Sequence, residues 1–171
     1  MTSMKRHLYV VRHAKAEDGS SFFGDFSREL TTAGQIDAAR MGKFLADNGL
    51  KPDLLVSSSA ARAYQTAQIM AEQLGYEVEK IQTTRQLYDE GPKAYLAAVN
   101  TAPQSCQHLL IFGHNPDVTY FAEYLSNSNI DSMSKGSVVR IDFDNLEWAE
   151  VSARTGTFVS YDTPKQLRPN L

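Results

Sequence analysis

Leu8-Tyr9-Val10-Val11-Arg12-His13-Ala14-Lys15 is a short apolar run that ends directly in basic residues. Four apolar residues in succession, without alternation, predict a strand that is buried on both faces of a sheet. Arg12 and His13 come immediately after the last apolar residue. We therefore expect both side chains at the carboxyl end of this strand.

Strand and helix patterns alternate along the rest of the chain. Strands are expected over residues 53–56, 77–81, 108–112, 137–143 and 147–152, with a turn at 144–145 joining the last two. Helices are expected over residues 31–48 and 60–74, from Pro92, and after the Gly113-His114-Asn115-Pro116 turn. The three serines at 57–59 are expected to cap the second helix. This order predicts an α/β three-layer sandwich with a mainly parallel central sheet, helices on both faces and antiparallel strands near the C-terminus.

Composition excludes several classes of protein. The chain has 171 residues, of which 42% are hydrophobic and 22% charged, which predicts one globular domain spanning residues 1–171. A net charge of −3 lacks the basic surface that a nucleic-acid partner requires. The apolar runs are far shorter than the ~20 residues that span a bilayer, so no membrane partner is expected. A single cysteine, Cys106, and no signal-peptide pattern indicate a cytoplasmic protein.

Three separate strand ends carry basic residues. Arg12 and His13 follow the first strand, Arg62 lies one short turn after the second, and His114 follows the strand at 108–112. Ligands of such sheets bind beyond the carboxyl ends of the strands, so we expect these four side chains to converge. Guanidinium groups present paired donors that match phosphoryl oxygens. Asn115, as the cap of a helix starting at Pro116, would add backbone N–H groups to this phosphate site.

His13 is the best candidate nucleophile of the four. A neutral imidazole retains one lone pair, and Arg12, Arg62 and His114 would neutralise the phosphoryl oxygens during transfer. Each residue alone has an ordinary structural explanation as a packed histidine or a surface arginine, and the joint placement favours function. Metal-ligand spacings, a phosphate-binding glycine loop and a dinucleotide fingerprint are absent from the sequence, so no metal and no cofactor are expected.

Three stretches of the chain resemble the histidine phosphatase superfamily, which has the phosphoglycerate-mutase-like fold. Residues 8–14 resemble its strand with the R-H-G signature, residues 57–67 (SSSAARAYQTA) its S-x-x-x-R-A-x-Q-T-A segment, and residues 113–116 its second histidine motif. Residues 12–15 (RHAK), 25–30 (DFSREL) and 164–169 (PKQLRP) are similar to the SixA-type phosphohistidine phosphatase branch. The resemblance implies that His13 is phosphorylated, that Arg12 and Arg62 bind phosphate, and that His114 completes the pocket.

The sequence departs from the family pattern at two positions. Ala14 replaces the usual glycine, and residues 28–30 read R-E-L where the branch more often has R-P-L. We therefore carry over Arg28, together with Lys15, only as a candidate phosphate or substrate contact. Many superfamily members have a carboxylate acid in the region of Asp89 and Glu90, and these two are the candidate general acids. Their alternative interpretation is a solvated loop.

The substrate class follows from the leaving group and from the small amount of chain available to cover the site. The SixA-like branch often lacks a well-defined acid, and a phosphohistidine imidazole can leave as a neutral group without one. Only segments 15–30 and 83–91 could cover the site, so an open pocket that admits a phosphorylated protein is expected. The preferred substrate is a protein carrying phosphohistidine, such as a phosphohistidine domain. The alternatives are a small phosphomonoester, or a phosphate-recognition module with little catalysis.

Overall fold

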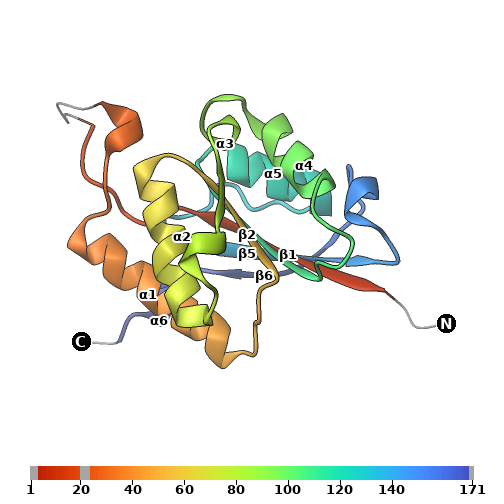
Figure 1. Ribbon diagram of the computed structural model, residues 1–171, viewed down its shortest axis with the longest axis horizontal. Coiled ribbons are helices and arrows are strands. Elements are labelled where there is room, and N and C mark those ends of the chain that lie inside the picture. Colours follow the sequence, from red (N-terminus) through yellow and green to blue (C-terminus); the bar gives the residue numbers. More distant parts are fainter. Residues whose placement is uncertain (1–3, 20–23, 170–171) are drawn as a thin grey trace.

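The computed structural model describes residues 4–19 and 24–169, which form one mixed β-sheet with helices on both faces (Figure 1). Within these residues the six strands have the order β3-β2-β4-β1-β5-β6. Their bounds are β1 Lys5–Arg12, β2 Leu54–Ser58, β3 Gln82–Thr84, β4 His108–Gly113, β5 Val138–Asp144 and β6 Thr157–Asp162. The first four strands along the sheet are parallel, whereas β5 is antiparallel to β1 and β6 is antiparallel to β5. The predicted α/β architecture is confirmed.

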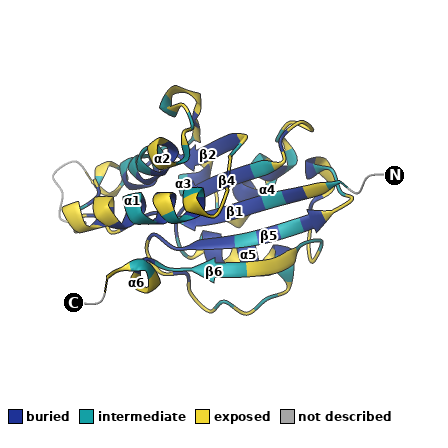
Figure 2. Ribbon diagram, turned by 90° about the horizontal axis from the view of Figure 1, so that it is seen from below, coloured by how far each residue is buried: buried dark blue, intermediate teal, exposed yellow. Residues whose placement is uncertain are grey.

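Two hydrophobic clusters separate the helices into two layers. Side chains alternate along β1, so that Leu8 and Val10 join one cluster while Tyr9 and Val11 join the other. One cluster includes residues of α3 (Gln86–Asp89), α4 (Pro92–Asn100) and α5 (Asp117–Ser126). The other lies beneath α1 (Thr32–Asp47), α2 (Ala61–Leu74) and α6 (Pro164–Leu167). Figure 2 shows that the central strands are largely buried while the edge strand β6 is exposed in part.

Local sequence signals account for the start of α1. The Thr31 side chain accepts a hydrogen bond from the Gly34 backbone N–H at 3.0 Å, which caps the helix. Gly34 has no side chain where α1 crosses the segment after β1, and a Cβ there would collide with the Lys15 carbonyl. This close approach holds α1 against the residues that follow His13.

Two of the predicted strands are wrong. Within residues 77–81 the structure has a 3-10 helix, η2 (Val78–Lys80), because the N–H groups of Lys80 and Ile81 bond back to Glu77 and Val78. The edge strand β3 begins only at Gln82. The two apolar residues of this stretch, Val78 and Ile81, are too few to distinguish a strand from a tight turn.

The second wrong strand is the one at 147–152. Trp148–Glu150 form a 3-10 helix, η3, in which Glu147 and Glu150 make a reciprocal capping box. Trp148 is buried, and its indole N–H donates to the Cys106 carbonyl at 2.7 Å. The antiparallel neighbours of β5 are therefore β1 and β6.

Among the helices of the described residues, none combines the length and the apolar composition that crossing a bilayer requires.

Candidate active site

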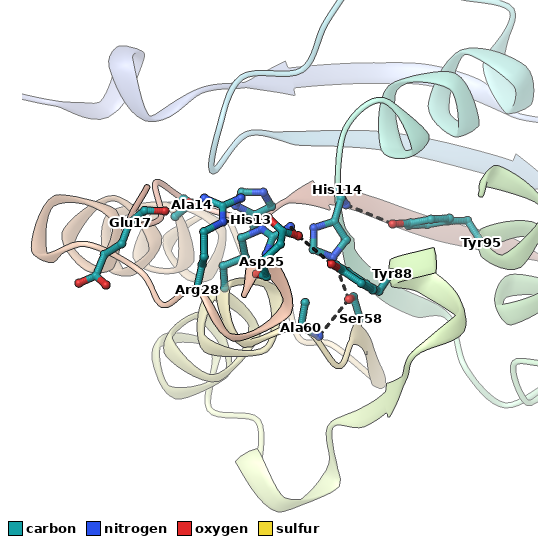
Figure 3. Close-up of polar contacts among 11 residues, drawn as sticks. His13, Ala14, Glu17, Asp25, Arg28, Ser58, Ala60, Tyr88, Tyr95 and His114 are labelled. Carbon is teal, nitrogen blue, oxygen red and sulfur yellow. Dashed lines mark hydrogen bonds and ion pairs between the residues drawn. The ribbon is translucent and has the colours of Figure 1, made fainter. Parts of the chain in front are cut away.

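The two histidines of the predicted site lie side by side after neighbouring parallel strands. Arg12 pairs in register with Gly113, so the next residues on β1 and β4 are His13 and His114. The His13 backbone N–H donates to the Gly113 carbonyl at 3.0 Å. The two imidazole centroids are 5.3 Å apart, with the rings inclined at 53° (Figure 3). The predicted convergence of these strand ends is thus present in the fold.

His13 is held in one tautomer by its own chain. Its Nδ1 lies 2.7 Å from the Ala14 carbonyl oxygen, which can only accept, so Nδ1 carries the proton and Nε2 keeps a lone pair. The side chain is buried, and burial lowers its pKa to about 3. The Ala14 hydrogen bond opposes this shift, while His114, Arg62 and Arg12 add to it. His13 is therefore uncharged at neutral pH.

His114 is fixed from two sides. Its Nε2 lies 2.8 Å from the Ser58 hydroxyl, and its backbone N–H donates to the Tyr95 hydroxyl at 3.1 Å. Gly113 permits the second contact, because a Cβ at that position would collide with the Tyr95 ring and hydroxyl. Burial, with the charge of Arg62 second, lowers the pKa of His114 to about 4. His114 is also uncharged at neutral pH.

The serines at 57–59 do not cap α2 as predicted. Ala60 is the N-cap residue and makes no side-chain cap, and Ser58 is fully buried at the end of the strand. Its hydroxyl accepts the Ala60 N–H at 3.2 Å and lies 2.8 Å from His114 Nε2. With the Ser58 hydroxyl as the donor in that contact, Nδ1 of His114 carries the ring proton. The sequence signal was the position of Ser58 at a strand end, next to the basic residues.

The arginines of the site are buried in part and incompletely bonded. Arg12 Nη1 donates to the Met133 carbonyl at 2.7 Å. Arg62, only 5% exposed, uses its two terminal nitrogens to bind Asp25. Burial lowers the pKa of Arg12, yet a guanidinium stays charged at neutral pH.

Three buried side-chain nitrogens have no hydrogen-bond partner among residues 4–19 and 24–169. They are Nε of Arg12, Nε of Arg62 and Nδ1 of His114. Unpaired buried donors are rare because each one loses its hydration without compensation. All three belong to the four residues that the sequence predicts at the strand ends. A ligand with several acceptor oxygens, such as a phosphoryl group, would satisfy them.

Asp25 and Tyr88 also line the site, and sequence reasoning gave neither a role. Asp25 lies in a 3-10 helix, η1 (Asp25–Ser27), and accepts from the Tyr88 hydroxyl at 2.7 Å. The Tyr88 ring stands edge-on to the His114 ring, with centroids 5.5 Å apart. Tyr88 immediately precedes the candidate acids Asp89 and Glu90. The sequence therefore indicated the correct segment but not Tyr88, the residue in it that contacts His114.

Asp89 and Glu90 lie at the end of α3, directly after Tyr88. Asp89 accepts from Arg85 Nε at 3.2 Å, and both carboxylates are exposed. Within the described chain, neither is hydrogen-bonded to His13 or His114. Their role as general acids stays a prediction.

Of the remaining candidate contacts, Asn115 and Arg28 are bonded within the protein. Pro116, not Asn115, is the N-cap residue of α5, so the predicted cap is wrong. The Asn115 amide instead donates to the Met133 carbonyl at 2.9 Å and accepts from Thr119. Lys15 has an exposed side chain, and Arg28 donates to the Asp25 carboxylate at 2.9 Å. Residues 20–23 of the predicted cover at 15–30 lie outside the described residues.

A cavity of about 380 Å³ opens beside Arg12. Its lining consists of Arg12, Asn115, Pro116, Thr119, Tyr120, Asp131 and Ser132. No group of three or more histidine, cysteine or acidic side chains that could hold a metal ion occurs among the described residues. The site therefore offers cationic and neutral hydrogen-bond donors around one nucleophilic nitrogen.

Comparisons with known proteins point to one family. The model of the histidine phosphatase superfamily (branch 1) matches residues 8–88. A SixA structure from Agrobacterium tumefaciens has a TM-score of 0.77 at 24% identity, covering 93% of this chain and 98% of that one. A protein histidine phosphatase SixA complexed with tungstate has a TM-score of 0.74 at 21% identity, covering 95% and 99%. At these identities the likeness shows the fold alone.

Curated relatives include a protein phosphatase. An uncharacterized chloroplastic protein of Arabidopsis thaliana is 26% identical over 171 aligned residues, covering 91% of this chain and 74% of that protein. The mitochondrial serine/threonine-protein phosphatase Pgam5 of Drosophila melanogaster is 38% identical over 77 residues. That match covers 44% of this chain and 26% of the relative, so the chain spans about a quarter of the relative's length.

Proposed function

We propose that this chain, whose residues 8–88 match the histidine phosphatase superfamily, is a metal-independent phosphohydrolase that works through a phosphohistidine intermediate on His13. The observation that carries the proposal is the set of three buried, unpaired nitrogens on Arg12, Arg62 and His114. A phosphoryl group supplies oxygen acceptors for all three at once. Within the proposal these three residues bind the transferred group while His13 attacks it.

His13 is suited to attack because its lone pair is available at neutral pH. With Nδ1 bonded to the Ala14 carbonyl, Nε2 is the nucleophilic atom. As the Nε2–P bond forms, positive charge develops on the ring, and the Ala14 carbonyl stabilises that charge. A pKa of about 3 means that protonation does not compete with attack until the solution is strongly acidic.

The phosphoryl group is transferred in two steps, first to His13 and then to water. In the first, His13 Nε2 donates its pair to phosphorus, and the bond between phosphorus and the leaving atom of the substrate breaks with its pair on that atom. In the second, water attacks phosphorus, the P–Nε2 bond breaks, and inorganic phosphate is released with His13 restored. Arg12 and Arg62 carry fixed positive charge beside the equatorial oxygens in both steps.

We propose a protein that carries phosphohistidine as the substrate. An imidazole whose distal nitrogen is protonated leaves as a neutral group, so it needs no strong acid at the site. Two further findings favour a phosphoprotein: the fold of the tungstate-bound SixA and the protein phosphatase among the relatives. A single domain spanning residues 1–171 and a cytoplasmic location stay predictions, and the relatives include chloroplastic and mitochondrial proteins.

The test compares turnover of a phosphohistidine protein with turnover of simple phosphate esters under the same conditions. We expect kcat/KM at least about a hundredfold higher for the phosphohistidine protein, since only that leaving group departs without a proton donor. Faster ester hydrolysis would assign the protein to small phosphomonoesters. Binding without phosphate release from either substrate would identify it as a recognition module.

A further inference from the structure

Arg62 is hydrogen-bonded to Asp25 through only one edge of its guanidinium group. Its Nη1 donates to the Asp25 carbonyl at 2.8 Å, and its Nη2 donates to the Asp25 carboxylate at 3.0 Å. Both contacts lie at the end of the side chain. The side edge, which contains Nε, is buried and has no partner in the described chain. A guanidinium can bind one acceptor group at its end and a second along its side.

Asp25 is itself held in place by two other side chains. The Tyr88 hydroxyl donates to the carboxylate oxygen that binds Arg62, at 2.7 Å. Arg28 donates to the other carboxylate oxygen at 2.9 Å and to the Glu17 carbonyl at 2.6 Å. Figure 3 shows Asp25 between Arg28 and Tyr88, on the side of the site where His13 and His114 lie. The Asp25 carboxylate therefore has a defined position even though half of its side chain is exposed.

The turn that carries Asp25 is anchored by aromatic contacts. The Phe26 ring stands edge-on to the Tyr88 ring, with centroids 5.0 Å apart, and the Arg85 guanidinium lies 4.4 Å from the Phe26 ring centre. Edge-on aromatic pairs and cation–π contacts are both attractive arrangements. They link the turn at 25–27 to the segment beside His114. The Tyr88 hydrogen bond, with Arg28 and Arg62, lowers the pKa of Asp25 to about 2, so it is ionised.

We propose that Asp25 is a positioning residue for phosphoryl transfer, which holds Arg62 by its end so that the Nε edge faces the phosphoryl group beside His13. This inference rests on the proposed function. Tyr88 and Arg28 fix the Asp25 carboxylate and so act on Arg62 indirectly. The opposite role is that Asp25 competes with the phosphoryl group for Arg62, and the two roles predict opposite changes in anion affinity.

The experiment is a double-mutant cycle between Asp25→Asn and Arg62→Ala. We measure kcat/KM for phosphohistidine hydrolysis and, independently, the dissociation constant of tungstate by calorimetry. Asp25→Asn should lower kcat/KM about thirtyfold and weaken tungstate about tenfold, because Arg62 is no longer held in the productive orientation. In the Arg62→Ala background the same substitution should change either quantity by less than about threefold.

Two further variants keep the result interpretable. Asp47→Asn is the matched control, since Asp47 is an exposed aspartate paired with Lys43 at the end of α1, and it should leave both quantities unchanged. Tyr88→Phe removes the hydroxyl that holds Asp25 but keeps the ring, so it should reproduce a part of the Asp25→Asn loss, about threefold to tenfold. It serves as the second variant if Asp25→Asn does not fold.

The outcomes separate this inference from the proposed function. Tighter tungstate binding by Asp25→Asn, or losses that multiply in the double variant, would overturn the positioning role. A wild type that binds tungstate with the expected coupling but hydrolyses nothing would overturn the proposed function and leave the positioning of Arg62 intact. A wild type that does not bind tungstate would overturn both.

Discussion

Strand β1 carries an arginine–histidine pair at each end, Arg6-His7 at its start and Arg12-His13 at its finish. Arg6 is 2% exposed, and all three of its side-chain nitrogens donate within the described chain. The acceptors are the carbonyls of Leu146, Gln104 and Cys106 and the sulfur of Met4. Arg12 is also half-buried, but its Nε has no such partner. The same residue type is a structural crosslink at one end and an incomplete binding site at the other.

The two histidines differ in their neighbours. His7 Nδ1 lies 2.8 Å from the Asp142 carboxylate, and its ring stacks on His108 with centroids 4.8 Å apart. His13 Nδ1 instead bonds to the adjacent Ala14 carbonyl, and its ring lies beside His114 with centroids 5.3 Å apart. Residue identity alone therefore does not indicate function. For the two arginines, function is indicated by the hydrogen-bonding capacity that remains unused after folding, because buried donors that no ligand needs are satisfied within the protein.

The largest expected effect tests the unpaired end of the strand. Arg12→Ala should lower kcat/KM by about a thousandfold, since it removes a fixed charge from the phosphoryl group. The free energy of unfolding should change by less than about 1 kcal/mol, because only one carbonyl contact is lost. Steady-state kinetics and urea unfolding measure the two quantities. If the variant is largely unfolded while its folded fraction keeps the wild-type kcat/KM, Arg12 is a structural residue and the comparison with Arg6 fails.

Arg6→Ala should show the opposite pattern. It removes the 2%-exposed guanidinium and leaves the part-buried carbonyls of Leu146 and Gln104 without their donor, so the free energy of unfolding should fall by about 3 kcal/mol. The folded protein should retain its kcat/KM, because Arg6 lies at the end of β1 away from His13. Urea unfolding and kinetics below the transition provide the measurement. A large loss of turnover at full folding would contradict the structural assignment of this end.

A smaller effect is expected on the pH dependence of stability. The pKa of His114 is about 4 in the folded protein, below its ordinary value of 6.5. The unfolded chain thus binds the extra proton first, and the free energy of unfolding falls as the pH drops from about 6.5 towards 4. Between pH 7 and pH 5 the free energy of unfolding should therefore fall by about 2 kcal/mol less in His114→Gln than in the wild type. Urea unfolding at both pH values measures this, and an unchanged pH dependence would show that His114 is not buried as an uncharged group.

The smallest effect expected is that of metal removal. Dialysis against a chelator should leave kcat unchanged, because the donors around His13 are cations and neutral groups that suit an anion. Turnover before and after dialysis is the measurement, with readdition of divalent ions as the control. A loss that a divalent ion restores would overturn the metal-independent mechanism.

The sequence predicted most of the fold because its signals are local. The apolar run at 8–11, the Thr31 cap and Pro92 at the start of α4 each fix an element through its own residues. The predictions failed at 77–81 and 147–152, where main-chain bonds within a few residues replaced strand pairing. Sequence patterns also could not find Asp25 and Tyr88, which are 63 residues apart and meet only in the folded chain.

The central claim is that His13 becomes covalently phosphorylated, and trapping tests it most directly. The protein is mixed with an isotopically labelled phosphohistidine protein and quenched in base, and the labelled peptide is identified by mass spectrometry. We predict an acid-labile label on His13 that forms within one turnover and is absent from His13→Ala. Turnover by the wild type without any label on His13, or a label on a different residue, would contradict the account.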